Sequence, residues 1–260
     1  MSETYFHFRG RKLVSDTSFP ILCIDAGNTR IKWGIRDGRG WVATGTIATG
    51  DSATLAASWK NAPAVQHAIA SNVAGAKVQA HLESACAPPG IVLRTIRSEA
   101  RQLGVVNGYR DPAQLGADRW AALIAAHHGE RGHKLVVNAG TALTIDALAD
   151  DGQFLGGLIV PGPALMRRSL DRGTAGLRLT EGTFHEFPES TPDAITSGAL
   201  QAAVGAIARA ADAMTRRGVA PGRLVLSGGA APEIAAHLPN PFVVHENLVL
   251  DGLALIARAA

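Results

Sequence analysis

The chain has 260 residues, of which 47% are apolar and 18% are charged, a balance that excludes a disordered protein. Its 25 basic residues only slightly exceed its 22 acidic ones and are scattered, which argues against nucleic-acid binding. No uncharged apolar stretch is long enough to span a bilayer, and two cysteines, Cys23 and Cys86, argue against a disulfide framework. We therefore expect a cytoplasmic protein with no membrane or nucleic-acid partner.

The predicted elements begin after an N-terminal extension. Residues 1–20 carry basic residues without a long apolar run, so we interpret them as an extension and not as a secretory signal. A first unit follows at 21–131. Apolar runs in it predict strands at 21–24, 31–35, 41–47, 64–71 and 91–95. Helices are predicted at 52–59, 75–86 and 116–128.

A second unit, residues 132–260, starts with the same order of elements. Strands are predicted at 135–137, 143–148 and 154–155, followed by a Gly/Pro-rich loop at 156–163. The rest of the unit is predicted to contain helices at 164–171, 192–217 and 248–259 and strands at 223–226 and 242–244. The sequence thus predicts a duplicated α/β unit whose two halves face one cleft.

Two similar turns occupy matching positions in the two units, Asp25-Ala26-Gly27-Asn28-Thr29 and Asn138-Ala139-Gly140-Thr141. Each follows a buried strand and precedes another. Glycine lets the backbone approach a phosphate closely, and N–H groups with a Thr or Asn side chain supply donors. A single such turn is better explained as an ordinary hairpin loop. Two in matching positions favour phosphate binding.

Charged residues near the first turn fit the same interpretation. Asp25, at the end of its strand, can hold a hydrated Mg²⁺, and Lys32 can reach a terminal phosphate. A third glycine turn, Ser227–Ala230, follows a strand and can pack against an adenine or ribose, but it is a weak signal alone. No G-x-x-x-x-G-K-[ST] motif is present.

Transfer of a phosphoryl group to an alcohol also needs a base that activates the acceptor. The best candidate is Asp118, which begins a predicted helix, with the guanidinium fork of Arg119 beside it. The alternative is an N-cap aspartate followed by a solvated arginine. The spacing alone leaves these two interpretations about equal.

From Ile21 to the C-terminus the sequence resembles the type III pantothenate kinases, of the acetate kinase, sugar kinase, Hsp70 and actin superfold. The stretch that resembles the family's first phosphate motif, which binds ATP, comprises Asp25, Ala26, Gly27, Asn28, Thr29, Arg30, Ile31 and Lys32. Thr141 resembles the ATP-contacting threonine of the second phosphate motif, and residues 156–162 resemble a further family signature. The residues that resemble the family's substrate-binding positions are Tyr109, Gly116, Ala117, Asp118, Arg119 and Thr191.

The resemblance implies two duplicated actin-like (ribonuclease H-like) α/β domains with ATP bound in the cleft between them. It implies transfer of the ATP γ-phosphoryl group to the primary hydroxyl of pantothenate, with Asp118 as the proton acceptor. It also implies a homodimer that depends on Mg²⁺ and on a monovalent cation, K⁺ or NH₄⁺. Asn138 stands where the family usually has an aspartate that helps to hold this cation, so we expect a weaker dependence on K⁺.

Two other functions remain open. One is another small-molecule kinase of the same superfold, although the chain lacks a long sugar-binding insertion. The other is a non-catalytic accessory factor for transcription. The chain keeps a full set of candidate catalytic residues, which a non-catalytic scaffold would not need, and this argues against the second alternative. The set comprises Asp25, Lys32, Asp118, Arg119 and Thr141.

Overall fold

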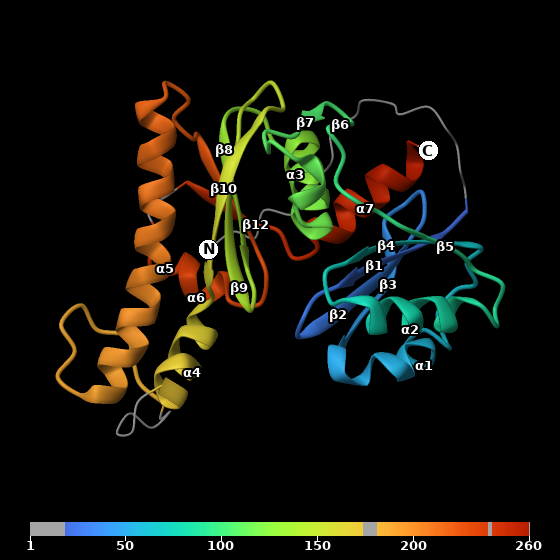
Figure 1. Cartoon of the computed structure of the whole chain (residues 1–260), viewed down its shortest axis with the longest axis horizontal. Helices are drawn as coiled ribbons and strands as arrows, with labels where there is room; N and C mark the ends of the chain where they lie inside the picture. Colours follow the sequence, from blue (N-terminus) through green and yellow to red (C-terminus); the bar gives the residue numbers. More distant parts are fainter. Residues whose placement is uncertain (1–18, 174–180, 239–240, 260) are drawn as a thin grey trace.

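Two five-stranded sheets with the same strand order form the framework of the protein (Figure 1). The computed structural model describes residues 19–173, 181–238 and 241–259, so most of the predicted extension, residues 1–18, lies outside the described residues. The first sheet has the order β3-β2-β1-β4-β5 and the second the order β10-β9-β8-β11-β12. In both sheets three antiparallel strands are followed by two parallel ones. The predicted duplicated actin-like fold is confirmed.

The first half of the chain builds the first sheet and its helices. The strands are β1 (Ile21–Ala26), β2 (Arg30–Arg36), β3 (Trp41–Ala48), β4 (His67–Asn72) and β5 (Val92–Thr95). A two-stranded ribbon of β6 (Arg101–Gln102) and β7 (Val105–Val106) follows. The helices are α1 (Leu55–Ser58), α2 (Ala76–Cys86) and α3 (Ala117–Gly129), with 3-10 turns at Thr49–Thr54 and Pro112–Gln114.

The second half repeats the pattern and contains the long helix α5. Its strands are β8 (Lys134–Ala139), β9 (Ala142–Leu148), β10 (Phe154–Pro161), β11 (Arg223–Ser227) and β12 (Phe242–Val244). Its helices are α4 (Pro163–Gly173), α5 (Thr191–Arg216), α6 (Ala231–Ala235) and α7 (Leu248–Arg258).

Two sequence predictions about elements were wrong. The segment predicted as a Gly/Pro-rich loop at 156–163 is mostly strand β10, which pairs with β9 as far as Pro161. β10 lies at the edge of its sheet, where a proline without an N–H is tolerated. The helix predicted at 52–59 is only partly α-helical: Leu55–Ser58 form a regular helix, and the residues before them belong to the 3-10 turn Thr49–Thr54.

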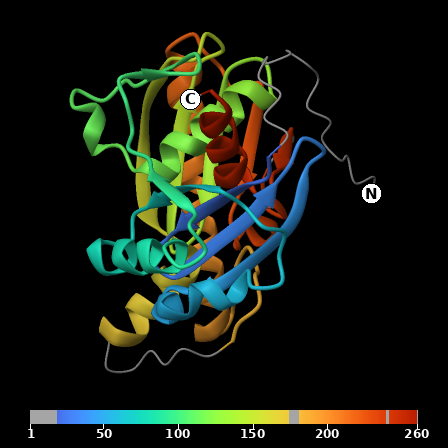
Figure 2. The same ribbon diagram turned by 90° about the vertical axis from the view of Figure 1, so that its right-hand side faces the viewer.

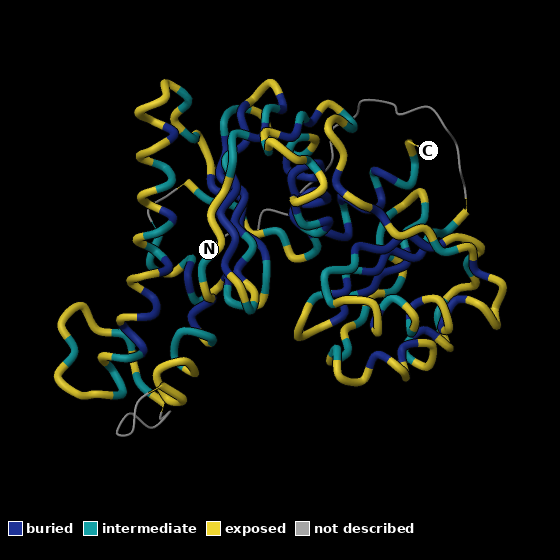
Figure 3. Tube along the Cα trace, in the orientation of Figure 1, coloured by how far each residue is buried: buried dark blue, intermediate teal, exposed yellow. Residues whose placement is uncertain are grey.

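Helices α3 and α7 pack against each other between the two sheets (Figures 1 and 2). One apolar core joins them to both sheets and includes Cys23 of β1, Trp120 of α3 and Val136 of β8. A side chain at Gly252 of α7 would clash with the carbonyl oxygen of Ala121, which explains a glycine at this close approach. Figure 3 shows the buried residues concentrated on these strands and on α3. The start of α3 is therefore fixed relative to both halves.

Candidate functional site

The two similar turns face each other across the space between the sheets. The hydroxyl oxygens of Thr29 and Thr141 lie 2.7 Å apart and share a hydrogen bond, although 112 positions separate them in the sequence. Each turn is closed by a similar backbone bond, from Gly27 N to Arg30 O and from Gly140 N to Ala142 O, both 3.0 Å. The duplicated fold thus brings two exposed sets of polar groups to one place, as the sequence predicted.

Asp25 lies near the end of β1, where the first turn begins, and is partly buried. Its carboxylate accepts one hydrogen bond, from Ser71 Oγ at 3.2 Å. Burial and the nearby charge of Asp118 raise the pKa of Asp25 to about 7. A carboxylate at this position, next to a glycine turn, is a group to which Mg²⁺ could bind.

Lys32 stands opposite Asp25 in the antiparallel pairing of β1 with β2. Its ammonium group donates to the carbonyl oxygen of Glu246 at 3.3 Å, just before α7. The Lys32 side chain therefore reaches from β2 of the first sheet to the segment that precedes α7.

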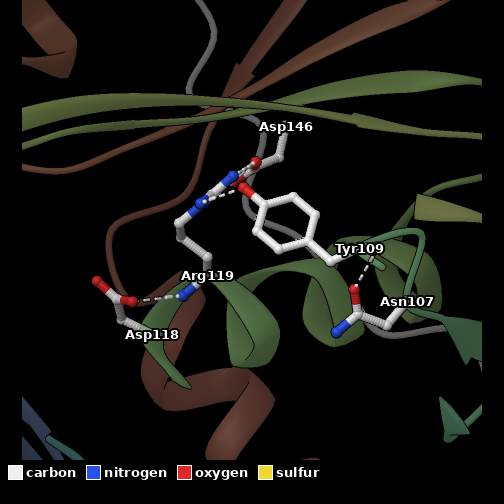
Figure 4. Close-up of polar contacts among 5 residues, drawn as sticks. All are labelled: Asn107, Tyr109, Asp118, Arg119 and Asp146. Carbon is white, nitrogen blue, oxygen red and sulfur yellow. Dashed lines mark hydrogen bonds and ion pairs between the residues drawn. The ribbon is translucent and has the colours of Figure 1, made fainter. Parts of the chain in front are cut away.

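Asp118 lies in the first turn of α3 and is mostly buried. Its carboxylate accepts a hydrogen bond from the backbone N–H of Arg119 at 2.8 Å. Burial raises the pKa of the Asp118 carboxyl. Figure 4 shows this carboxylate on the opposite side of Arg119 from the guanidinium.

Arg119 is not the solvated arginine of the alternative interpretation, because only 4% of it is exposed. Its Nε donates to both carboxylate oxygens of Asp146 on β9, at 3.1 and 3.2 Å, and its Nη2 makes a further short contact with the same group. Its Nη1 donates to the hydroxyl of Tyr109 at 3.0 Å (Figure 4). Asp146, which the sequence analysis missed, is therefore part of the site.

The loop that carries Tyr109 is held by buried polar groups. The amide oxygen of Asn107 accepts from Tyr109 N at 3.0 Å, and its Nδ2 donates to the carbonyl oxygens of Glu99 and Pro112. Ser98 donates to the carbonyls of Pro112 and Leu115. The Asn107 side chain thus holds the loop that carries Tyr109.

Asn138 is the last residue but one of β8 and has polar neighbours on both sides. It pairs in register with Thr144 of β9 and with Ser227 of β11. The Thr144 hydroxyl is buried and has no hydrogen-bond partner among the described residues.

Thr191 lies apart from the other predicted site residues. It begins α5, which packs on β8, β9, α4 and α6, all of the second half (Figure 1). Within one chain the structure therefore does not bring Thr191 to Asp118.

The described residues contain neither a cluster of metal-binding side chains nor a membrane-spanning helix. Across the described ranges, no three His, Cys, Asp or Glu side chains are grouped so that they could hold a metal ion, and His127 and His128 contact each other at the end of α3. Every helix in the same ranges is too short or too polar to cross a membrane.

Comparison with known proteins gives a consistent result. The sequence profile described as type III pantothenate kinase matches residues 21–213. A type III pantothenate kinase from Aromatoleum aromaticum is 46% identical over 239 residues, covering 92% of this chain and 98% of the relative. One from Nitrosospira multiformis is 44% identical over 238 residues, covering 92% and 91%.

Solved structures share the fold at lower identity. A conserved Baf family protein from Campylobacter jejuni superposes with a TM-score of 0.59 at 20% identity, covering 92% of this chain and 98% of that chain. A protein described as a 2-dehydro-3-deoxygalactonokinase from Sinorhizobium meliloti gives 0.58 at 18% identity, covering 92% and 96%. With a family profile that spans most of its length and relatives above 40% identity, this chain belongs to the type III pantothenate kinase family.

Proposed function

We propose that the protein is an ATP-dependent pantothenate kinase. It transfers the γ-phosphoryl group of ATP to the primary hydroxyl of pantothenate, giving 4′-phosphopantothenate in the first step of coenzyme A biosynthesis. Membership of the family supports this function, and one geometric observation carries it. The two turns meet at the hydrogen bond between the hydroxyls of Thr29 and Thr141, with Asp25 at the start of the first turn. A carboxylate that could hold Mg²⁺ thus lies beside a place for phosphates, and the charge of Asp118 contributes to raising its pKa.

On this proposal, ATP lies along the facing turns. The polyphosphate contacts the turn residues, from Asp25 to Lys32, and Thr141 of the second turn. Asp25 holds Mg²⁺, which neutralises charge on the phosphate oxygens when it is bound. Backbone N–H groups of the turns and the Lys32 ammonium supply further positive potential.

Pantothenate lies at the start of α3 in this proposal. Asp118 accepts the proton of the attacking hydroxyl, and burial that raises its pKa makes it a stronger proton acceptor than an exposed aspartate. Gly116 and Ala117 leave room beside it. Arg119 and Tyr109 supply hydrogen-bond donors for the polar groups of the substrate.

An assay of ADP release with and without pantothenate tests the function. We expect release that pantothenate stimulates strongly and a phosphorylated pantothenate as product. Stimulation by a sugar acid instead would indicate another kinase of the same fold. No ADP release with any added acceptor would favour a non-catalytic regulator.

We further propose a cytoplasmic homodimer that shares its sites. Thr191 lies away from Asp118 within one chain, so its contact with pantothenate requires Thr191 of the partner subunit. Phe187, in the segment before α5, is 89% exposed, as expected for a residue that a second copy covers. Cell fractionation and sedimentation check the location and the dimer.

Mixing two inactive variants checks the shared site. Asp118→Asn and Thr191→Ala subunits are each expected to be impaired as homodimers. Their mixed dimers have one site with both residues intact, so about one quarter of the wild-type activity should return. If no activity returns although mixed dimers form, Thr191 does not act across the interface.

We propose that Asn138 holds the monovalent cation weakly. Its amide oxygen, with the neighbouring oxygens of Thr144 and Ser227, offers ligands for K⁺ but no negative charge. Asn138→Asp should therefore increase activation by K⁺, measured as ADP release over a K⁺ titration with choline as the replacement cation. Strong and equal activation of the wild type and the variant would contradict this role.

A further inference from the structure

Asp146 links the second sheet to the start of α3 through Arg119. Both side chains are almost fully buried, with 2% and 4% exposed, respectively. The Asp146 carboxylate binds the Nε and Nη2 edge of the guanidinium, a bidentate arrangement that fixes the plane of the group. Because β9 and α3 belong to different halves of the chain, this contact sets where the guanidinium stands relative to both.

The ion pair with Asp146 uses only some of the N–H donors of the Arg119 guanidinium. A guanidinium has five N–H donors. Asp146 occupies the Nε donor and one on Nη2, and Tyr109 occupies one on Nη1. With respect to the described residues, one N–H on each Nη is left for a substrate oxygen. Asp146 also neutralises the charge of Arg119. The remaining N–H donors would therefore bind a substrate oxygen mainly through directed hydrogen bonds and less through net charge.

Strand β10 is shaped to admit this pair. Gly157 pairs with Asp146 in the β9–β10 register. A Cβ atom at Gly157 would clash with Asp146 Oδ1 and would lie 2.6 Å from Nη2 of Arg119. The rings of Tyr109 and Phe154 lie on the guanidinium, 5.6 and 5.9 Å from its carbon atom. The Arg119 guanidinium is thus enclosed by the Asp146 carboxylate, the backbone at Gly157 and the rings of Tyr109 and Phe154.

We propose that Asp146 is a positioning residue for the acceptor substrate, which acts by holding the Arg119 guanidinium beside Tyr109 and away from Asp118. Without Asp146, the adjacent residue Asp118 becomes the carboxylate available to Arg119. An ion pair between them would occupy the group that we propose as the base. This inference rests on the proposed function, because Arg119 and Asp118 are assigned there.

Asp146→Asn tests the inference through a comparison of the two substrates. The variant keeps the shape and one acceptor oxygen but loses the charge. We expect the KM for pantothenate to rise on the order of tenfold, the effect of losing one charge-assisted hydrogen bond, while the KM for ATP stays unchanged. Asp251→Asn is the matched control, because it breaks the Arg36–Asp251 ion pair between β2 and α7 and should leave the pantothenate KM unchanged.

Gly157→Ala provides a second route that keeps both charges. It should displace the guanidinium and raise the pantothenate KM selectively, even if Asp146→Asn fails to fold. Gly38→Ala, in the turn between β2 and β3, is its control, because a Cβ atom there meets open space. Thermal unfolding of every variant separates loss of fold from loss of substrate affinity.

A double-mutant cycle decides whether Asp146 acts through Arg119. In an Arg119→Met background, Asp146→Asn should cause no further rise in the pantothenate KM. An unchanged pantothenate KM in folded Asp146→Asn or Gly157→Ala would overturn the inference, as would an equal effect in the Arg119→Met background. If the wild type shows no pantothenate-dependent ADP release, the proposed function fails and this inference falls with it.

Discussion

Asp118→Asn is expected to lower the kcat for pantothenate phosphorylation by about 100-fold to 10,000-fold, the usual contribution of a positioned general base. The amide keeps the size of the side chain and its hydrogen bond to the N–H of Arg119, so the fold should be retained. Only the ability to accept the hydroxyl proton is lost. Steady-state ADP release over a range of pantothenate concentrations measures the effect.

The matched control for this variant is Asp111→Asn. Asp111 lies seven positions earlier, directly before the 3-10 turn Pro112–Gln114, and accepts a hydrogen bond from the N–H of Ala113, which an asparagine also accepts. Its kcat should equal that of the wild type. Unaltered turnover in folded Asp118→Asn would remove Asp118 as the base and would leave proton transfer to water or to the phosphate itself.

Asp25→Asn is expected to abolish Mg²⁺-dependent activity and to stabilise the ligand-free protein at the same time. The pKa of Asp25 in the folded protein is raised from the ordinary 3.8 to about 7, mainly by burial. The folded state therefore binds this proton more tightly than the unfolded state, and stability falls as the pH rises from about 4 to 7. At pH 8 the ionised Asp25 lowers the free energy of unfolding by roughly 2 to 4 kcal/mol, which an uncharged asparagine avoids.

Chemical unfolding at pH 5 and at pH 8 checks the sign of this effect. Asp25→Asn should be more stable than the wild type at pH 8 and differ less from it at pH 5. Asp51→Asn, at an exposed position of the 3-10 turn after β3, serves as the control and should change neither measurement. A variant that is less stable than the wild type at pH 8 would show that Asp25 is held by favourable contacts and carries no such electrostatic cost.

The same proton links activity to pH. A carboxylate must lose its proton to bind Mg²⁺, so the apparent affinity for Mg²⁺ should fall by about tenfold for each pH unit below 7. High Mg²⁺ concentration should restore part of the activity at pH 6. The reason is that ionising the buried Asp25 carboxylate costs free energy, and a bound Mg²⁺ ion would offset this cost.

Local sequence patterns were enough to predict most of the secondary structure of this protein. Apolar runs bounded by turns placed most strands and helices, because burial and turn geometry act over a few neighbouring residues. The two small-Gly-polar turns were recognised for the same reason, and the resemblance of the flanking residues led to the family that the comparisons confirm. The misread segment, β10, shows the limit: glycine and proline indicate a loop by composition, and only the register with β9 makes them an edge strand.

The pairing of Arg119 with Asp146 was decided by tertiary structure alone. The two residues are 27 positions apart, on a helix of one half and a strand of the other, and no spacing rule connects them. The placement of Thr191 on the far side of the second sheet likewise follows from how α5 packs. The sequence alone therefore predicted the turns and most of the elements, and it named Asp118 as a candidate base. The packing of α3 between two sheets decided which side chains surround that base, because such contacts depend on distances that only the assembled core sets.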